Sequence, residues 1–258
     1  MTFTTDASRA LLDARWNLSP IPPLRETNPD LDVAGAYAIQ LGTVDEIVAK
    51  TGPVVGYKIG LTSLAMQQQL GVDSPDFGFF TQGMFYEDGA TIPTGDFISL
   101  KVEPEFAFKL NKDLPTAGVT ADDVRDAVES VHAAIEIIDS RIANWDIKLV
   151  DTIADNASCG AVAVNLTPLN VTMDELTGIS CGLVIDGTET GRGTGADVLG
   201  DPANAVAWLA NALGEQGTKL SAGDWVLPGS FCAAAPIAAG GTAVADFGDL
   251  GSLTIHFS

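Results

Sequence analysis

The chain has 258 residues, of which 34 are Asp or Glu and 13 are Lys or Arg, so its formal net charge is −21 at pH 7. Because 46% of the residues are hydrophobic, this acidity does not indicate a disordered tail, and the length allows a sizeable core. Nucleic acid is excluded as an expected partner, since binding it needs a basic surface, and an anionic membrane surface is disfavoured for the same reason.

The acidic residues have an unusual make-up, with 24 Asp, 10 Glu and only 7 Lys. An Asp-rich, Lys-poor surface keeps a protein soluble in concentrated salt, although self-repulsion destabilises it at low salt. Two interpretations stay open, namely adaptation to salt or acid and compositional drift toward Asp, Ala, Gly and Thr.

The cysteines and the N-terminus indicate the compartment. Cys159, Cys181 and Cys232 lie far apart without a CxxC spacing, which predicts small buried thiols in a reducing cytoplasm rather than disulfides or a zinc site. The first residues include Asp6 and Asp13 and no apolar run, so we expect no signal peptide. No stretch reaches the roughly 20 apolar residues that a membrane-spanning helix needs.

Residues 1–50 are predicted to be a helical N-terminal arm. Residues 4–16 carry apolar side chains at helical spacing, and a proline-rich linker follows at 18–24. Asp32 can cap a second helix, which we expect to continue to about Lys50.

The character of the sequence changes at Gly52, and residues 51–258 are predicted to form one β-rich domain. Short apolar strands are separated by Gly, Pro and Asp, and Asp186-Gly187 indicates a tight hairpin turn. Since strands and helices do not alternate strictly, the expected fold is α+β with a mixed, β-rich core. Helices are expected near 63–70, 120–127 and 201–215, and strands near 53–60, 90–92, 102–110, 130–138, 160–166, 179–186, 188–193, 224–227, 241–247 and 252–257.

Three glutamates are the strongest candidates for a metal site. Glu103 and Glu105 alternate along a predicted strand, so both side chains project from one face about 6.6 Å apart. Glu136 lies inside an apolar run, where a carboxylate is costly unless it is paired or binds a metal. If the three converge, their oxygen ligands suit Mg²⁺ or Mn²⁺ better than zinc. The alternative is an exposed edge strand, which Pro104 would suit.

Lys58 and Asp76 are the candidate acid and base. Lys58 lies in a glycine-flanked apolar strand, where desolvation and a nearby cation would lower its pKa toward neutrality. The alternative is a strand lysine whose ammonium reaches solvent. Asp76 follows a segment with Gly and Pro, so a turn-capping role is its default interpretation.

Two polar segments are candidates for contacts with a substrate. The segment 151–160 is rich in Asp, Asn and Ser without periodicity, so Asn156 and Ser158 either cap a loop or line a pocket. Gly229-Ser230 follows a strand, and such a turn can present backbone N–H groups to a carboxylate.

Other features narrow the choice of chemistry. The chain has no GxSxG elbow, no P-loop and no GxGxxG followed by a suitable acidic residue. His132 and His256 lie in strand patterns away from the clusters, so both are expected to be structural. Asp139 and Arg141 are close enough in sequence to form a structural ion pair.

Six segments, in order along nearly the whole chain, resemble the hydratase and decarboxylase branch of the fumarylacetoacetate hydrolase superfamily. They are VGYKIGLTS at 55–63, MQQQLGVDSPDFG at 66–78, VEPEFAF at 102–108, EIIDSRIANWDIKLVDTIADNASCG at 136–160, the pattern around AVAWLAN at 199–213, and LGSLTIHF at 250–257. Each segment alone is modest evidence, whereas their ordered succession is specific.

The resemblance implies an activity for the β-rich domain. It implies hydration of 2-hydroxypenta-2,4-dienoate (2-oxopent-4-enoate) to 4-hydroxy-2-oxopentanoate in the meta-cleavage catabolism of aromatic compounds. The alternatives that stay open are 4-oxalocrotonate decarboxylase, 2-oxohept-4-ene-1,7-dioate hydratase and a non-catalytic subunit that stabilises a partner enzyme. The related C–C hydrolases use an additional histidine, and no histidine here lies near a motif.

The resemblance also implies roles for single residues. It implies Mg²⁺ or Mn²⁺ held by Glu103, Glu105 and Glu136, acid/base roles for Lys58 and Asp76, and a pocket role for Ser158. Contacts with substrate are expected from Asn156, Gly229 and Ser230. The turn after the strand ending at Leu227 departs from the family pattern, since Pro228 stands where relatives often have Thr-Gly, which puts the carboxylate-binding role of Gly229 and Ser230 in doubt. A homo-oligomer built on pentamers is implied, with association with a decarboxylase or an aldolase.

Overall fold

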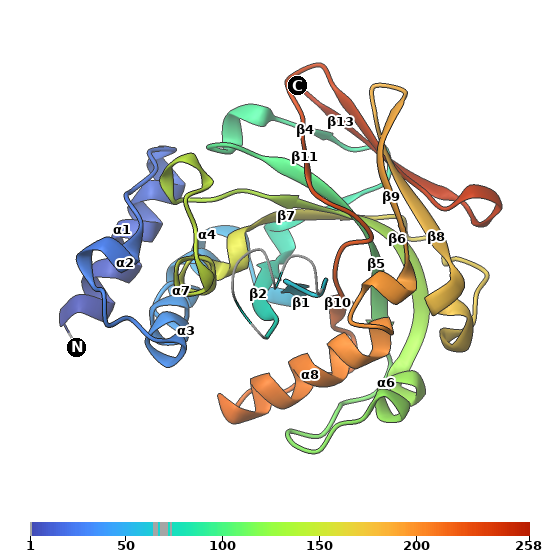
Figure 1. The fold of residues 1–258 in the computed structure, drawn as a ribbon, viewed down its shortest axis with the longest axis horizontal. Helices are drawn as coiled ribbons and strands as arrows, with labels where there is room; N and C mark the ends of the chain where they lie inside the picture. Colours follow the sequence, from blue (N-terminus) through green and yellow to red (C-terminus); the bar gives the residue numbers. More distant parts are fainter. Residues whose placement is uncertain (1, 64–66, 68–71, 73) are drawn as a thin grey trace.

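Two β-sheets form the centre of the chain, and helices cover them at two ends (Figure 1). The computed structural model describes residues 2–63, 67, 72 and 74–258. In the part of the chain that is described, no helix is long and apolar enough to cross a membrane. The helix predicted at 63–70 falls mostly outside the described residues.

Four helices make up the first fifty residues: α1 (Thr2–Asn17), α2 (Leu24–Thr27), α3 (Val33–Leu41) and α4 (Val44–Thr51). Asp32 caps α3 as predicted, accepting a hydrogen bond of 2.8 Å from the backbone N–H of Gly35. The prediction of one helix from 32 to 50 is wrong, because the chain turns at Gly42. A Cβ atom there would lie 2.4 Å from the Oγ of Ser8, so glycine allows α1 to pack against the turn.

The larger sheet has the strand order β2-β1-β10-β5-β6-β7-β3, with β11 also paired to β5. Its strands are β1 (Val54–Gly60), β2 (Asp76–Thr81), β3 (Phe85–Glu87), β5 (Lys101–Leu110), β6 (Val128–Ile138), β7 (Cys159–Val164), β10 (Trp225–Leu227) and β11 (Ala235–Pro236). The smaller sheet has the order β4-β13-β12-β8-β9 and contains β4 (Thr91–Ile92), β8 (Ser180–Ile185), β9 (Thr188–Thr194), β12 (Thr242–Asp246) and β13 (Ser252–Phe257). The predicted hairpin turn between β8 and β9 is confirmed, with positive φ at both Asp186 and Gly187.

The mixed pairing of these strands confirms an α+β fold with a β-rich core. Most strand pairs are antiparallel, and β1–β10, β3–β7 and β4–β13 are parallel. The prediction that β5 is an exposed edge is wrong, because β6 pairs along one side of it and β10 and β11 pair with its two ends on the other. Pro104 lies in the stretch between β10 and β11, where no continuous strand needs its missing N–H.

A hydrophobic core joins the two sheets. Phe106 of β5 lies between Phe231 and Phe247, at ring-centroid distances of 4.7 and 5.3 Å. Helix α8 (Pro202–Glu215) packs into the same core, and α6 (Ala121–Ala127) lies beside it. Figure 1 shows α6 and α8 together at the bottom of the view, away from the N-terminal helices.

A separate apolar cluster connects the N-terminal helices to α7 (Leu149–Ala154), which the sequence did not predict. Its buried members include Leu11 of α1, Ile39 of α3 and Ile153 of α7. Helix α7 leads directly into the polar segment 155–160, and α2 and α3 lie beside α7 at the left of Figure 1.

Candidate active site

The three predicted metal ligands meet at one point between β5 and β6. Glu103 and Glu136 are direct partners in the antiparallel register, and Glu105 follows Glu103 on the same face of β5. One carboxylate oxygen of each residue lies within 4.8 Å of the others. Glu105 and Glu136 are each only 1% exposed, so this is a buried concentration of negative charge.

The pKa values of these three glutamates are raised, which shows that their ionised forms are unfavourable so close together without a cation. Burial, and then the charge of Glu136, raise the pKa of Glu103 from 4.5 to about 7. Burial and its two neighbours raise the pKa of Glu105 well above its ordinary value. Burial also raises the pKa of Glu136, although the charge of Lys58 opposes this. Among the described residues the Oε2 atom of Glu136 has no hydrogen-bond partner. Three hard oxygen ligands with an unpartnered buried oxygen fit a divalent cation such as Mg²⁺ or Mn²⁺.

Lys58 is the cation that faces these carboxylates. It lies on β1, is 3% exposed, and its Nζ is 3.1 Å from Oε1 of Glu136. Burial alone would lower the pKa of Lys58, but the charges of Glu136 and Asp76 outweigh burial and raise it. The expected lowering of this pKa is therefore wrong for the chain without a cation, and so is a solvent-exposed ammonium. A bound divalent cation would act in the opposite direction.

Asp76 lies beside Lys58 rather than in a turn. It is the first residue of β2, 2% exposed, and it pairs with Gly60 at the end of β1. A Cβ atom on Gly60 would be 2.3 Å from Oδ1 of Asp76 and 3.4 Å from Nζ of Lys58, so only glycine leaves room for both side chains. Burial raises the pKa of Asp76, and the charge of Lys58 opposes this.

Ser158 is presented by a strained turn. Asn156, Ala157 and Ser158 have φ values of 54°, 48° and 56°, three consecutive non-glycine residues in the left-handed region. Each such residue costs about 1–2 kcal/mol, and strain of this kind concentrates at functional sites. The hydroxyl of Thr152 lies 3.5 Å from that of Ser158.

The side chain of Asn156 holds this turn against β2. Its Oδ1 accepts a hydrogen bond of 2.9 Å from the N–H of Phe79, and its Nδ2 donates one of 2.8 Å to the carbonyl of Phe79. A Cβ atom on Gly78 would lie 2.3 Å from the carbonyl oxygen of Asn156, so the turn and the strand are in close contact. The predicted contact of Asn156 with substrate is thus replaced by a bond to the protein backbone.

The turn after β10 contacts the glutamates directly. The backbone N–H of Gly229 donates a hydrogen bond of 2.9 Å to Oε2 of Glu105. Gly229 has a φ of +131°, and a Cβ atom there would be 2.1 Å from Oγ1 of Thr62. This N–H therefore binds a carboxylate of the chain itself and not, as predicted, one of the substrate. Ser230 lines the cleft described below, and its hydroxyl donates to the carbonyl of Cys232 at 2.7 Å.

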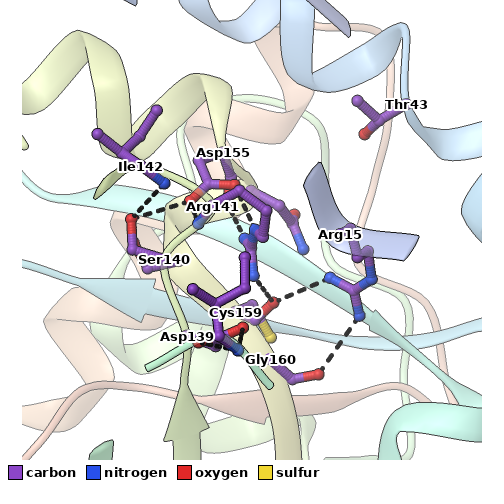
Figure 2. Close-up of polar contacts among 12 residues, drawn as sticks. Arg15, Thr43, Asp139, Ser140, Arg141, Ile142, Asp155, Cys159 and Gly160 are labelled. Carbon is purple, nitrogen blue, oxygen red and sulfur yellow. Dashed lines mark hydrogen bonds and ion pairs between the residues drawn. The ribbon is translucent and has the colours of Figure 1, made fainter. Parts of the chain in front are cut away.

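A layer of buried polar groups supports the strained turn from behind (Figure 2). Arg141, 3% exposed, forms an ion pair with Asp155, which also accepts the backbone N–H of Arg141 at 2.9 Å. Nη1 of Arg141 donates to the carbonyl of Cys159 at 3.3 Å, and Arg15 of α1 approaches the same oxygen at 3.4 Å. The expected Asp139–Arg141 pair is wrong, because Asp139 accepts the backbone N–H groups of residues 98 and 99 instead.

These groups surround a cleft of about 650 Å³. Its lining includes six of the residues predicted from the sequence and a second group that was not predicted. The predicted ones are Lys58, Asp76, Glu103, Glu105, Ser158 and Ser230 without Glu136, and the missed ones include Lys101, Trp145, Thr152, Arg192, Asp197 and Cys232. Lys101 could have been found, since the alternation that places Glu103 and Glu105 on one face places Lys101 there too.

The histidines take no part in this cluster of carboxylates, whereas Cys232 lines the cleft. His132 bonds to Ser130 and to the carbonyl of Asn165, and neither histidine lines the cleft. The three cysteines are free thiols; Cys159 and Cys181 are buried, as predicted, and Cys232 is half-buried.

Comparison with known proteins places this site in a family. The family model "Fumarylacetoacetate (FAA) hydrolase C-terminal" matches residues 56–258, which contain all the acidic and basic groups described around the glutamates. The chain belongs to the fumarylacetoacetate hydrolase family. This membership confirms the resemblance drawn from the sequence motifs and the expected family fold.

Relatives within the fumarylacetoacetate hydrolase family cover nearly the whole chain. A 2-keto-4-pentenoate hydratase of Paraburkholderia xenovorans (strain LB400) is 43% identical over 226 residues, 88% of this chain and 84% of the relative. A 2-hydroxyhexa-2,4-dienoate hydratase of Comamonas testosteroni is 39% identical over 258 residues, 99% of this chain and 98% of the relative. The solved structure of 4-oxalocrotonate decarboxylase from Pseudomonas putida G7, complexed with magnesium and adipate, matches with a TM-score of 0.93 and 30% identity, covering 99% of this chain and 97% of that one.

Proposed function

We propose that the chain is a metal-dependent hydro-lyase that adds water to 2-hydroxypenta-2,4-dienoate (2-oxopent-4-enoate) and gives 4-hydroxy-2-oxopentanoate. The observation that carries the proposal is the convergence of three carboxylates within 4.8 Å beside a buried lysine, next to a cleft large enough for a small acid. Relatives 43% identical to the chain carry the name 2-keto-4-pentenoate hydratase, and the 30% identical decarboxylase was solved with magnesium.

Glu103, Glu105 and Glu136 would hold the cation, Mg²⁺ or Mn²⁺. When bound, it supplies Lewis-acid polarisation of the substrate's carboxylate and C2 oxygen. The N–H of Gly229 keeps Glu105 oriented toward this position. Lys58 neutralises part of the charge of Glu136 and so lets three carboxylates remain together in a buried place.

Proton transfers fall to Lys58 and Asp76, which lie side by side over Gly60. The 2-hydroxyl loses a proton and C5 gains one, which gives the α,β-unsaturated 2-oxo acid. The oxygen of water then bonds to C4 and the water loses one proton. C3 gains one proton, so the overall step adds one molecule of water. Ser158 lines the cleft beside these groups and orients water or substrate.

The remaining residues act through others. Asn156 holds the strained turn on β2 and thereby places Ser158. Ser230, which forms a backbone bridge with Glu105, contacts substrate in the cleft. Residues 1–50 form the helical N-terminal arm, and residues 51–258 form the catalytic domain whose polar segment that arm supports through Arg15.

Metal add-back tests this proposal. Dialysed wild-type protein should remove the dienol absorbance only when Mg²⁺ or Mn²⁺ is returned, and Glu105→Ala should stay inactive with either ion. Glu129→Ala changes an exposed glutamate on β6 and should behave as wild type. Metal-independent hydration by the Glu105→Ala protein would refute the metal role, and loss of absorbance only after a partner enzyme is added would favour the non-catalytic alternative.

Decarboxylation is the second candidate, because the decarboxylase structure matches the fold over 99% of the chain. The higher identity of 43% to a hydratase, against 30% to the decarboxylase, favours hydration. A panel of 2-hydroxydienoates with and without a second carboxylate separates the pentadienoate hydratase, the heptenedioate hydratase and the decarboxylase, since only the last releases CO₂.

We also propose that the protein is cytoplasmic, forms a homo-oligomer built on pentamers and associates with a decarboxylase or an aldolase. Free thiols support the compartment. Exposed apolar side chains on the N-terminal helices, Val33 and Leu41 at 42% and 52% exposure, support a contact surface there. Mass measurement in solution at several protein concentrations tests the oligomer, and a monomer at all of them would refute it.

A further inference from the structure

Arg15 of α1 is a positive charge without an acidic partner among the described residues. Its guanidinium donates to two backbone carbonyls, that of Cys159 at 3.4 Å and that of Gly160 at 3.5 Å (Figure 2). Both distances exceed the usual N–H···O range of about 2.7–3.2 Å. Each of the other five arginines of the chain lies within ion-pair distance of a carboxylate. Arg15 is therefore the exception in an otherwise strongly acidic protein.

A second guanidinium, that of Arg141, lies beside Arg15. Its Nη1 donates to the same carbonyl oxygen of Cys159 at 3.3 Å, so the two Nη1 atoms lie within about 7 Å of each other. Asp155 neutralises Arg141 through an ion pair and accepts its backbone N–H. Asp139, the other carboxylate whose charge acts on Arg15, accepts the backbone N–H groups of residues 98 and 99. One of the two guanidinium charges is therefore left without a paired carboxylate.

The charge of Arg15 is unfavourable where it lies. Burial, and then the charge of Arg141, lower the pKa of Arg15 from 12.5 to about 10. The guanidinium nevertheless stays protonated at pH 7, because even the lowered pKa lies well above neutrality. A half-buried positive charge of this kind is stabilised by a counter-ion more than by further backbone carbonyls.

A small cavity adjoins both guanidinium groups. Its volume is about 10 Å³, which is room for one occupant of the size of a water molecule. Arg15, Arg141 and Asp155 contribute the charged groups of its lining, and Leu12 and Ile47 are among its apolar residues. These charged groups sum to one positive charge. An ion with one negative charge and nearly the size of water therefore matches both the volume and the charge of the cavity.

We propose that this cavity binds a small monovalent anion of the chloride class, held between the guanidinium groups of Arg15 and Arg141. The site is separate from the cleft beside the glutamates, since neither arginine lines that cleft. The anion is a structural ligand, because it connects α1 to the start of β7 and to the strained turn that presents Ser158. A water molecule in the same cavity would complete hydrogen bonds but would leave the positive charge in place.

Exchange of chloride for a larger anion at constant ionic strength tests this site. The ionic strength must be constant because salt also screens the self-repulsion of a chain with a net charge of −21. Gluconate is too large for the cavity, so sodium gluconate is the reference salt. Sodium chloride at about ten times its Kd should raise the unfolding temperature of the full chain by about 3–6 °C, and the increase should saturate with chloride concentration. Crystals of the wild-type protein soaked in bromide should show an anomalous peak between the two guanidinium groups.

Arg15→Gln should remove the chloride-specific increase, because it removes the charge that lacks a carboxylate. Arg9→Gln is the matched control on the same helix. Arg9 pairs with Asp13 and Glu46, each at 3.3 Å, and does not line the cavity, so this variant should keep the increase.

Three results would each overturn the inference. They are equal unfolding temperatures of the wild type in chloride and gluconate, an undiminished increase in Arg15→Gln, and wild-type crystals without a bromide peak, which would mean that the cavity holds water only. If the Arg15→Gln protein does not fold, the bromide experiment on the wild type decides alone.

Discussion

Among the described residues, two ion pairs join basic and acidic side chains that are both almost fully buried, and the pairs differ in how completely their polar atoms are hydrogen-bonded. Arg141 and Asp155 are 3% exposed each, and hydrogen bonds from Arg141 and Ser140 reach both carboxylate oxygens of Asp155. Lys58 and Glu136 are equally buried, but two more glutamates adjoin them and one oxygen of Glu136 is unpartnered. The Arg141–Asp155 pair, the complete pair, stabilises the backbone around it. The Lys58–Glu136 pair, the incomplete pair, leaves carboxylate oxygens free to bind a cation.

Replacing Lys58, the basic residue of the incomplete pair, should have the largest effect of all the changes considered, and the effect should be on kcat. Lys58→Met eliminates a proton-transfer group, so we expect kcat to fall about 10²- to 10⁴-fold at saturating Mg²⁺. The variant should fold when Mg²⁺ is present, because the metal replaces the lost positive charge. Steady-state kinetics with circular dichroism measures both. Lys50→Met changes an exposed lysine and should leave kcat unchanged. Wild-type kcat in Lys58→Met would remove the lysine from the mechanism.

Breaking the complete pair should act on stability instead. Asp155→Ala leaves the buried guanidinium of Arg141 without its partner, which we expect to reduce the free energy of unfolding by about 3–5 kcal/mol. Asp146→Ala also removes an arginine partner, that of Arg25, but at a site 58% exposed, where the loss should be below about 1 kcal/mol. Denaturant titration compares the variants. Similar losses for both would show that burial does not distinguish the two pairs.

The pH dependence of stability should depend on metal. Without a cation, the pKa of Glu103 is raised from 4.5 to about 7, so between these values the folded state holds a proton that the unfolded state has released. The free energy of unfolding should then fall as pH rises from about 4.5 through about 7. Mg²⁺ binding favours the ionised carboxylates, so stability at neutral pH should rise by about 2.7 kcal/mol at a hundred times its Kd. Denaturation between about pH 5 and pH 8, with and without Mg²⁺, measures this difference, which Glu103→Gln should reduce.

The smallest effect is expected at the strained turn between the two pairs. Ala157→Gly relieves a left-handed residue at about 1–2 kcal/mol but adds backbone freedom to the unfolded chain, so a net gain of about 0.5 kcal/mol is expected. Ala157→Val should destabilise the protein, since a β-branched residue fits this region worst. Thermal unfolding ranks the three proteins, and a glycine variant less stable than wild type would show that the turn is not strained.

Much of the site was predictable because its signals are local. Glu103 and Glu105 are two residues apart on one strand, so strand geometry alone places them on the same face. Glu136 lies in an apolar run, where an unpaired carboxylate is unfavourable, so it can be singled out as well. The three glutamates converge because the register of β5 against β6 pairs Glu103 with Glu136. No local sequence pattern predicts that register. Asn156 was identified as purposeful, but the partner of its amide, Phe79, belongs to a strand that sequence patterns did not predict.

The predictions that were wrong also have physical causes. The run of residues 76–81 is buried at every position, so it lacks the alternation that indicates a strand, and the sequence alone favours a turn role for Asp76. The pKa of Lys58 was expected to fall because a cation was assumed nearby, whereas the carboxylates that surround it raise this pKa. Helix periodicity continues through Gly42, although α3 ends at Leu41 and α4 begins at Val44, with Ser8 of α1 close against the glycine.

The bond from Arg15 to the carbonyl of Cys159 has a consequence for synthesis of the chain. The two residues are 144 positions apart, so the first helix leaves the ribosome long before its partner strand exists. At about 5–20 residues per second the interval is about 7–30 s. Throughout it Arg15 lacks its acceptor, because β7 is made later, whereas α1 can already pack on α3. The attachment of α1 to the polar segment 155–160 is therefore a late step in the folding of the chain.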